Sequence, residues 1–314
     1  MPVWGWIVLG ILFLAVAPVM LLSSIIFRGL LLRPKGEKRE RKCNFPEEAE
    51  YVEMYTAAEK WREQEKKYKQ DVRIVNDGLN LYGEYYDFGF DRAAVMLPGR
   101  TETCVYSSYF AEPYRQEGWN ILVIDGRAHG LSDGRLNCLG YREYRDVLKW
   151  IGLLEEKGNR EVWIHGLCIG SFTALACCTA KERPACLAGM TAEGMYRNFY
   201  ITTRNHMKDQ GHPTFPLLYG LMAWIRLCCG GSAVFDGPFR RMPKMQLPIL
   251  MLHSREDIFS VPKLAQALYD SCPSGKKRLV WFDKGGHSRI RVNNTEQYDE
   301  AIRRYLADLG KGAA

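Results

Sequence analysis

Three side chains that could together perform nucleophilic chemistry on acyl groups stand far apart in this 314-residue chain. Cys168 lies between Gly166 and Gly170, Asp257 follows an apolar run, and His287 ends a glycine-containing segment. In such a trio the imidazole takes the proton of the thiol, and the carboxylate fixes the tautomer of the imidazole. The residue types therefore suggest a thiol nucleophile, provided that the fold brings the three side chains together.

Each of these residues also has an ordinary structural explanation when it is considered alone. The pattern G-x-C-x-G could be a glycine-rich strand end, Asp257 could cap a helix that begins near Val261, and His287 could be a loop histidine with satisfied hydrogen bonds. Their common placement favours chemistry, because each follows a different predicted strand, and parallel strands end at the same edge of a sheet.

The elements that must position these residues are short apolar runs that alternate with amphipathic helical segments. The triplet Asn76-Asp77-Gly78 predicts a hairpin between the first two runs. The eight predicted strands are Val72–Val75, Leu79–Tyr86, Ala93–Leu97, Ile121–Ile124, Val162–His165, Cys186–Met190, Ile249–His253 and Leu279–Phe282. The predicted helices are Tyr51–Trp61, Ser107–Gln116, Arg142–Glu156, Phe172–Lys181, Lys263–Leu268 and Glu296–Leu309. This alternation predicts an α/β fold, with a mostly parallel sheet covered by helices on both faces.

The alternation lapses over residues 194–241, which are rich in aromatic and apolar side chains. A segment of this length between two strands is long for a simple connection. We predict a helical lid over the site, and ordinary helical packing is the alternative.

Residues 1–27 are predicted to be a transmembrane anchor. No charged side chain occurs from Val3 to Phe27, and a helix of that length at about 1.5 Å per residue exceeds the ~30 Å hydrocarbon core of a bilayer. A cleaved signal peptide would need a basic start and a small-residue cleavage site. The chain begins Met-Pro-Val-Trp and lacks such a site near Phe27, so an uncleaved single-pass anchor is favoured.

The net charge of +7 is concentrated beside this anchor. Seven basic and two acidic side chains lie between Arg28 and Lys42, which leaves +2 for residues 43–314. A nearly neutral body argues against nucleic acid as a partner, because phosphate binding needs a basic patch on the folded domain. We predict a basic juxtamembrane linker and helix over residues 28–70, and a catalytic domain over 71–314. The positive-inside rule places that domain in the cytosol, unless the basic segment only adds solubility.

The ten cysteines do not form a pattern typical of metal binding or of a disulfide scaffold. The vicinal pairs Cys177-Cys178 and Cys228-Cys229 match neither, so most of the cysteines are predicted to be buried apolar residues in a reducing compartment. No metal and no cofactor is expected.

Five motifs in order make residues from about Val72 to Leu309 resemble the α/β-hydrolase superfamily, and in particular membrane-anchored bacterial hydrolases. They are Asp77–Leu81, Leu97–Arg100, Asp125–Ser132, the strand–turn–helix elbow around Cys168, and the pair of loops that carry Asp257 and His287. The resemblance implies an eight-stranded α/β-hydrolase sheet. It also implies cleavage of an ester, thioester, lactone or amide through an acyl-enzyme, with Cys168, Asp257 and His287 as the catalytic triad.

The sequence departs from the family pattern at three places. Cys168 replaces the usual serine, and Pro98 replaces a histidine, so the resemblance assigns the oxyanion hole to the backbone N–H groups of Arg100 and Ile169. Ala128 replaces a glycine, and the neighbouring His129 is expected to be structural. Ser171 lies one turn into the predicted helix and is not expected to be the nucleophile.

The leading prediction is a membrane-anchored esterase-like hydrolase that acts on a small-molecule or lipid-like acyl substrate. A thioester intermediate is also open to attack by amines, so an acyltransferase is one alternative. A catalytically silent, hydrolase-like binding protein is the other. The sequence makes no prediction of the oligomeric state.

Overall fold

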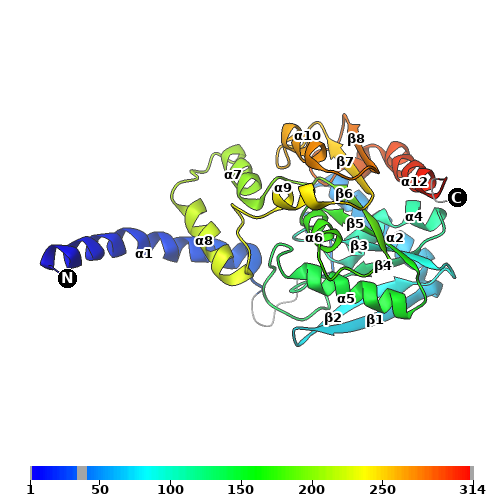
Figure 1. Ribbon diagram of the computed structural model, residues 1–314, viewed down its shortest axis with the longest axis horizontal. Coiled ribbons are helices and arrows are strands. Elements are labelled where there is room, and N and C mark those ends of the chain that lie inside the picture. The colour runs from blue at the N-terminus through cyan, green and yellow to red at the C-terminus, as the bar shows by residue number, and fades with distance from the viewer. Residues whose placement is uncertain (1, 34–40, 312–314) are drawn as a thin grey trace.

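The computed structural model describes residues 2–33 and 41–311. Figure 1 shows a layered α/β body from which one long helix, α1 (Val3–Leu31), projects with the N-terminus at its far end. Among the described residues, α1 is the one helix long and apolar enough to cross a membrane, with a mean hydropathy of 2.5. The C-terminal helix α12 (Thr295–Lys311) lies on the side of the body away from α1.

Eight strands form one sheet in the order β1-β2-β4-β3-β5-β6-β7-β8. The first strand is antiparallel to β2 and β2 to β4, whereas all the other neighbours are parallel. Their bounds are β1 Lys69–Asn76, β2 Leu79–Tyr86, β3 Arg92–Leu97, β4 Asn120–Ile124, β5 Glu161–Leu167, β6 Leu187–Glu193, β7 Ile249–Ser254 and β8 Lys277–Phe282. The predicted eight-stranded, mostly parallel sheet and its opening hairpin are confirmed.

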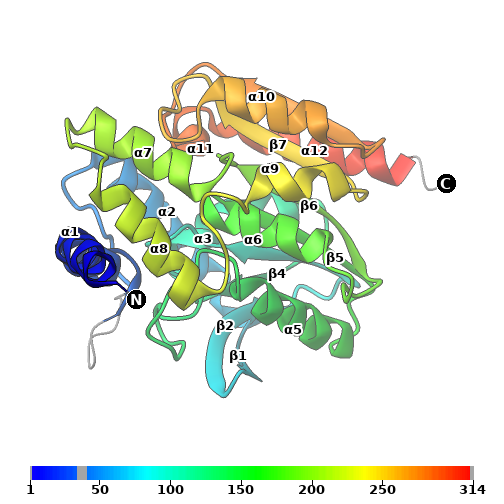
Figure 2. The same ribbon diagram turned by 60° about the vertical axis from the view of Figure 1, so that its left-hand side comes forward.

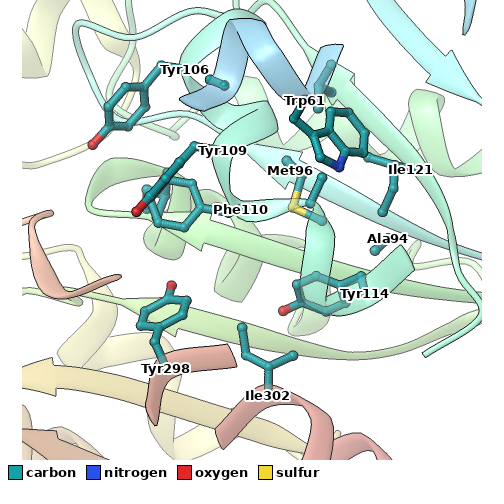
Figure 3. Close-up of a cluster of buried hydrophobic side chains, with 14 of the residues drawn as sticks. Trp61, Ala94, Met96, Tyr106, Tyr109, Phe110, Tyr114, Ile121, Tyr298 and Ile302 are labelled. Atoms are coloured by element: carbon teal, nitrogen blue, oxygen red, sulfur yellow. The ribbon is translucent and has the colours of Figure 1, made fainter. Parts of the chain in front are cut away.

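Side chains alternate between two hydrophobic cores, one on each face of the sheet, as the pleat of a strand requires. In β3, Ala94 and Met96 join one core, and Val95 and Leu97 join the other. Figure 3 shows part of the first core, where aromatic side chains such as Tyr114 gather over the sheet. Because helices cover both faces of the sheet, most residues of its central strands are apolar.

Helices α2, α3, α4 and α12 cover the first core, and α5, α6 and α10 cover the second. The bounds not yet given are α2 Ala49–Gln64, α3 Cys104–Ser107, α4 Glu112–Gln116, α5 Glu143–Glu156, α6 Ile169–Cys178, α10 Pro262–Ser271 and α11 Ile290–Asn293. The single helix predicted over Ser107–Gln116 is wrong, since α3 and α4 are separated by a 3-10 turn. Pro113 lacks the N–H that a continuous helix would need there.

The segment between β6 and β7 folds into α7 (Phe199–Asp209), α8 (Leu217–Cys229) and α9 (Pro238–Arg241). We call α7 and α8 the cap helices. Figure 2 shows α8 lying beside α1, at the end of the body where α1 joins it. The segment predicted to be a lid is therefore helical, and its helix α8 contacts α1.

The helix α1 does not end at residue 27, as the sequence suggested, but continues to Leu31. Leu32 then pairs with Leu136 in an isolated bridge, so the chain is attached to the body where a linker was expected. One extra turn forms, in which Leu30 and Leu31 pack against apolar side chains of the body. Of the basic residues predicted to surround the membrane junction, Lys35, Lys38 and Arg39 lie outside the described residues.

Candidate active site

Cys168 occupies the sharp turn between β5 and α6. Its backbone has φ 52° and ψ −110°, which side-chain-bearing residues rarely adopt. Its N–H donates to the carbonyl of Glu193 at 3.0 Å, which ties the turn to the neighbouring strand β6. A strained backbone of this kind is common at functional sites, where it holds a side chain in a fixed direction.

The two flanking glycines are required by close packing. A Cβ atom on Gly166 would lie 2.4 Å from the carbonyl carbon of Gly170, and one on Gly170 would lie 2.5 Å from the carbonyl oxygen of Leu97. Ser171 is buried and donates its hydroxyl to the carbonyls of Gly166 and Glu193. This agrees with the prediction that Ser171 is not the nucleophile.

Asp257 and His287 come from the loops after β7 and β8 and meet as a hydrogen-bonded pair. Nδ1 of His287 lies 2.7 Å from Oδ2 of Asp257. The other carboxylate oxygen, Oδ1, accepts the N–H groups of Phe259 and Ser260 at 2.9 and 2.7 Å. The carboxylate is thus held by its own loop, and it orients the imidazole as the predicted triad would require.

The electrostatics of the pair follow from this contact. Burial would lower the pKa of His287, but the charge of Asp257, the nearby Cys168 and hydrogen bonds to both hold it well above its usual range. Burial would raise the pKa of Asp257, but the charge and the hydrogen bond of His287 lower it below the usual value. The three residues predicted from the sequence are therefore brought together, with the imidazole between the thiol and the carboxylate.

A cavity of about 350 Å³ contains Cys168 and His287 in its wall. Arg100 and Ile169, the predicted oxyanion residues, line the same cavity, as do the apolar side chains Leu30, Phe45, Tyr196, Phe199 and Phe259. The cap helix α7 contributes four residues to this wall, from Phe199 to His206. The cavity can therefore hold an apolar group next to the thiol.

The loop that carries Arg100 is fixed by the D-x-R-x-H-G-x-S turn. Nε2 of His129 lies 2.7 Å from the carbonyl oxygen of Arg100, and Nδ1 lies 2.7 Å from that of Arg127. His129 is buried and both of its ring nitrogens face backbone carbonyls, the arrangement expected for the predicted structural role. Ala128 has φ 63°, a left-handed conformation that explains why glycine is usual at this position.

Two buried carboxyl groups near the site were missed by the sequence reasoning. Glu102 lines the cavity, accepts hydrogen bonds from Tyr51 and Thr101, and has its pKa raised by burial to about 8. Glu193, at the end of β6, has its pKa raised by burial to about 7. A signal was available, because both follow apolar strands at the carboxyl edge of the sheet, where ligands bind in open α/β folds.

Within residues 2–33 and 41–311, no group of three or more His, Cys, Asp or Glu side chains is placed to hold a metal ion.

Comparisons with known proteins agree with the fold. A family model described as alpha/beta hydrolase fold matches residues 95–194, which include β5 and the elbow. The chain is 26% identical over 221 residues to the uncharacterized protein YqkD of Bacillus subtilis, which is 68% of this chain and 71% of that protein. It is 24% identical over 198 residues to the uncharacterized membrane protein YNL320W of Saccharomyces cerevisiae, 63% of this chain and 64% of that one.

Among solved structures, the chain is similar to the Pyrococcus furiosus esterase Pf2001. The TM-score is 0.65 at 19% sequence identity, covering 79% of this chain and 95% of the esterase. At that identity the likeness establishes the fold, and it leaves the activity to be argued from the residues of the site.

Proposed function

We propose that this chain, which belongs to the α/β-hydrolase superfamily by its fold and by the family match, cleaves an ester, thioester or related acyl bond through a Cys168–His287–Asp257 triad. The observation that carries the proposal is the placement of a strained Cys168 in one cavity with a His287 that is hydrogen-bonded to Asp257. A structural cysteine would have no need of such a partner.

In the proposed reaction, Sγ of Cys168 attacks the carbonyl carbon of the substrate while His287 takes the thiol proton. The carbonyl oxygen becomes negative and is stabilised by the N–H groups of Arg100 and Ile169. The C–O or C–S bond to the leaving group breaks, and His287 returns its proton to that group. Water, deprotonated by His287, then attacks the carbonyl carbon of the thioester. The C–S bond breaks, His287 returns the proton to Sγ of Cys168, and the carboxylic acid is released.

The substrate we propose is a small-molecule or lipid-like acyl compound. The cavity offers an apolar wall, and the helix α1 is long and apolar enough to hold the protein in a bilayer. We further propose that residues 1–27 are a single-pass anchor, that residues 28–70 connect it, that residues 71–314 form the catalytic domain with a lid over 194–241, and that this domain is cytosolic. The basic residues between Arg28 and Lys42 support that orientation.

The test is labelling of the full-length protein in detergent with a thiol-reactive acyl probe, together with turnover of p-nitrophenyl acetate. We expect Cys168→Ala and His287→Ala to lose the label and to lower kcat about 10³-fold or more. Cys186→Ala is the matched control, since Cys186 is also half-buried but lies directly before β6 and does not line the cavity. Full turnover in Cys168→Ala would refute the triad.

The same assay distinguishes the alternatives. Addition of amines or alcohols tests acyl transfer, because an acyltransferase would form the corresponding amide or ester in place of the free acid. Absence of both label and turnover in the unmodified protein would favour a catalytically silent binding protein.

A further inference from the structure

The last turn of α1 is part of the wall of the catalytic cavity. Leu30 lines the cavity together with Cys168 and His287. Nη1 of Arg100, the residue proposed to supply an oxyanion N–H, donates to the carbonyl oxygen of Leu30 at 3.1 Å. The helix that would anchor the protein therefore touches both the substrate cavity and the loop proposed to stabilise the reacting oxygen.

The end of α1 is held firmly against the catalytic body. The N–H of Asn137 donates to the carbonyl of Leu31 at 2.9 Å. The guanidinium of Arg33 donates to the carbonyls of Ser132 and Gly134 at 3.1 and 2.9 Å. Leu31 itself is fully buried. A bilayer that contains α1 must therefore lie at a fixed distance from the cavity.

The cap helix α8 packs directly on α1, as the two views in Figures 1 and 2 show. A Cβ atom on Gly220 of α8 would lie 2.3 Å from Oγ of Ser23, so the two helices approach closely there. Nε1 of Trp224 donates to the carbonyl of Met20 at 2.9 Å. Because α8 contacts α1 at Met20 and Ser23, which lie within the proposed anchor, a bilayer that contains residues 1–27 also reaches the cap.

An apolar groove of about 1330 Å³ runs along α1 beside α8. It is lined by residues of α1 from Trp6 to Leu32 and by Trp224 and Cys228 of α8. Two large apolar side chains of the cap are also exposed: Leu227 on α8 at 69% and Phe215 just before α8 at 77%. The groove and the cavity share no lining residue, but both reach the end of α1, since Leu30 lines the cavity and Arg28 and Leu32 line the groove.

We propose that an acyl chain of a bilayer lipid reaches Cys168 laterally along α1, and that Leu30 forms the wall that the chain must pass. The inference rests on the proposed acyl-bond cleavage at Cys168. The occupant is an acyl chain because apolar side chains line most of the groove, with Ser24 and Arg28 at the end nearest the body, and because a helix of this hydropathy meets lipid. The anchor is then a part of the substrate site in addition to being a tether.

The test uses the full-length protein in phosphatidylcholine vesicles with two substrates, p-nitrophenyl palmitate in the same vesicles and p-nitrophenyl acetate in water. The readout is the kcat/KM for the palmitate ester divided by the kcat/KM for the acetate ester. Leu30→Trp narrows the passage beside residue 30 and is expected to lower this ratio about tenfold, the usual scale for a steric change in an apolar pocket. Leu30→Ala widens the same passage and is expected to raise the ratio about threefold.

Leu14→Trp is the matched control. Leu14 lies on the same helix, is 73% exposed and lines neither the cavity nor the groove, so the ratio should stay as in the unmodified protein. Leu30→Ala cannot overpack the site, so it decides the question if Leu30→Trp does not fold. A ratio unchanged in Leu30→Ala would overturn the proposal.

The route is tested separately by placing p-nitrophenyl palmitate in protein-free vesicles. Lateral access predicts a rate about tenfold or more below that seen with substrate in the protein's own vesicles, because a long-chain ester leaves a bilayer slowly. Equal rates would show delivery through water and would overturn the proposal. If acetate turnover does not depend on Cys168, the proposed function fails; if it does and the Leu30 variants leave the ratio unchanged, the failure is confined to the route.

Discussion

Cys168 combines a reactive side chain with a backbone conformation that costs about 1–3 kcal/mol in a residue other than glycine. The cost is tolerated because neighbouring backbone closes tightly around the turn. Gly170 lies against the carbonyls of Leu97 and Pro98, so the start of α6 packs closely on the end of β3 beside the elbow. Local packing therefore sets the direction of the thiol before any substrate arrives.

This packing makes a prediction about Gly170. The Cβ of Gly170→Ala would lie 2.5 Å from the carbonyl oxygen of Leu97, so backbone must move, and the free energy of unfolding should fall by about 2 kcal/mol or more. Gly152→Ala is the control, because a Cβ there has no atom within 4 Å, and alanine in a helix should add up to about 1 kcal/mol. Denaturant unfolding of both variants measures the difference, and equal stabilities would contradict the prediction.

A second prediction at the residue scale concerns the pH dependence of stability through Glu102. The side chain is buried, and its pKa is raised from 4.5 to about 8 in the folded protein. Between those two values the folded state keeps a proton that the unfolded state has lost. Stability should therefore fall as the pH rises through this window, by up to roughly 1.4 kcal/mol per pH unit from this group.

Glu102→Gln removes this titration, so the variant should gain stability relative to the unmodified protein as the pH is raised from about 5 to 8. Thermal unfolding in detergent at several pH values gives the comparison. Glu156→Gln is the control, because Glu156 is exposed at the end of α5 and should leave the pH profile parallel to that of the unmodified protein. A parallel profile for Glu102→Gln as well would show that the carboxyl is ionised when folded.

At the scale of elements, the cap helices depend on a small number of polar contacts. Asn198 begins α7: its Oδ1 accepts the N–H of Ile201 at 2.9 Å, and its Nδ2 donates to the carbonyl of Val234 at 2.8 Å. The Asn198 side chain thus caps one free N–H at the start of α7 and links this helix to the segment that follows α8. Since α7 supplies cavity residues, order in this helix bears on the substrate site.

Asn198→Ala should therefore loosen α7 selectively. Loss of the cap is worth about 0.5–2 kcal/mol, and hydrogen exchange of the α7 amides should accelerate by a corresponding factor while that of α5 stays the same. Asn198→Asp keeps an acceptor for Ile201 and should restore most of the protection. Equal exchange in α7 of Asn198→Ala and the unmodified protein would contradict a capping role.

For the whole molecule, the distribution of charge predicts a membrane orientation. The +5 between Arg28 and Lys42 follows directly on an apolar helix, and the rest of the body is close to neutral. We expect the protein to resist extraction by alkaline carbonate. We also expect external protease to spare the body in sealed right-side-out vesicles and to digest it in inverted ones.

Detergent-permeabilised vesicles are the control in that experiment, since protease then reaches both faces. Digestion of the body in intact right-side-out vesicles would place it outside the cytosol. Release by carbonate would contradict a spanning α1.

Sequence pattern predicted the sheet well because strand runs such as Val162–His165 are apolar on both faces, a pattern that only a covered parallel sheet explains. It predicted element ends less well. The helix placed over Ser107–Gln116 is interrupted by the 3-10 turn Ser108–Phe110, and α1 continues to Leu31, because contacts with distant residues help to decide where a helix stops.

The sequence by itself determined the fold class, the apolar N-terminal helix and the three side chains Cys168, Asp257 and His287, because periodicity and motif order are local properties of the chain. Only the tertiary structure decided that Leu30 lines the cavity, that Gly220 meets Ser23, and that Glu102 is buried beside the site. These are contacts between segments far apart in sequence. The sequence of one segment does not reveal which other segment it will contact. The short distances between these side chains, and the loss of water around Glu102, arise only when the chain folds.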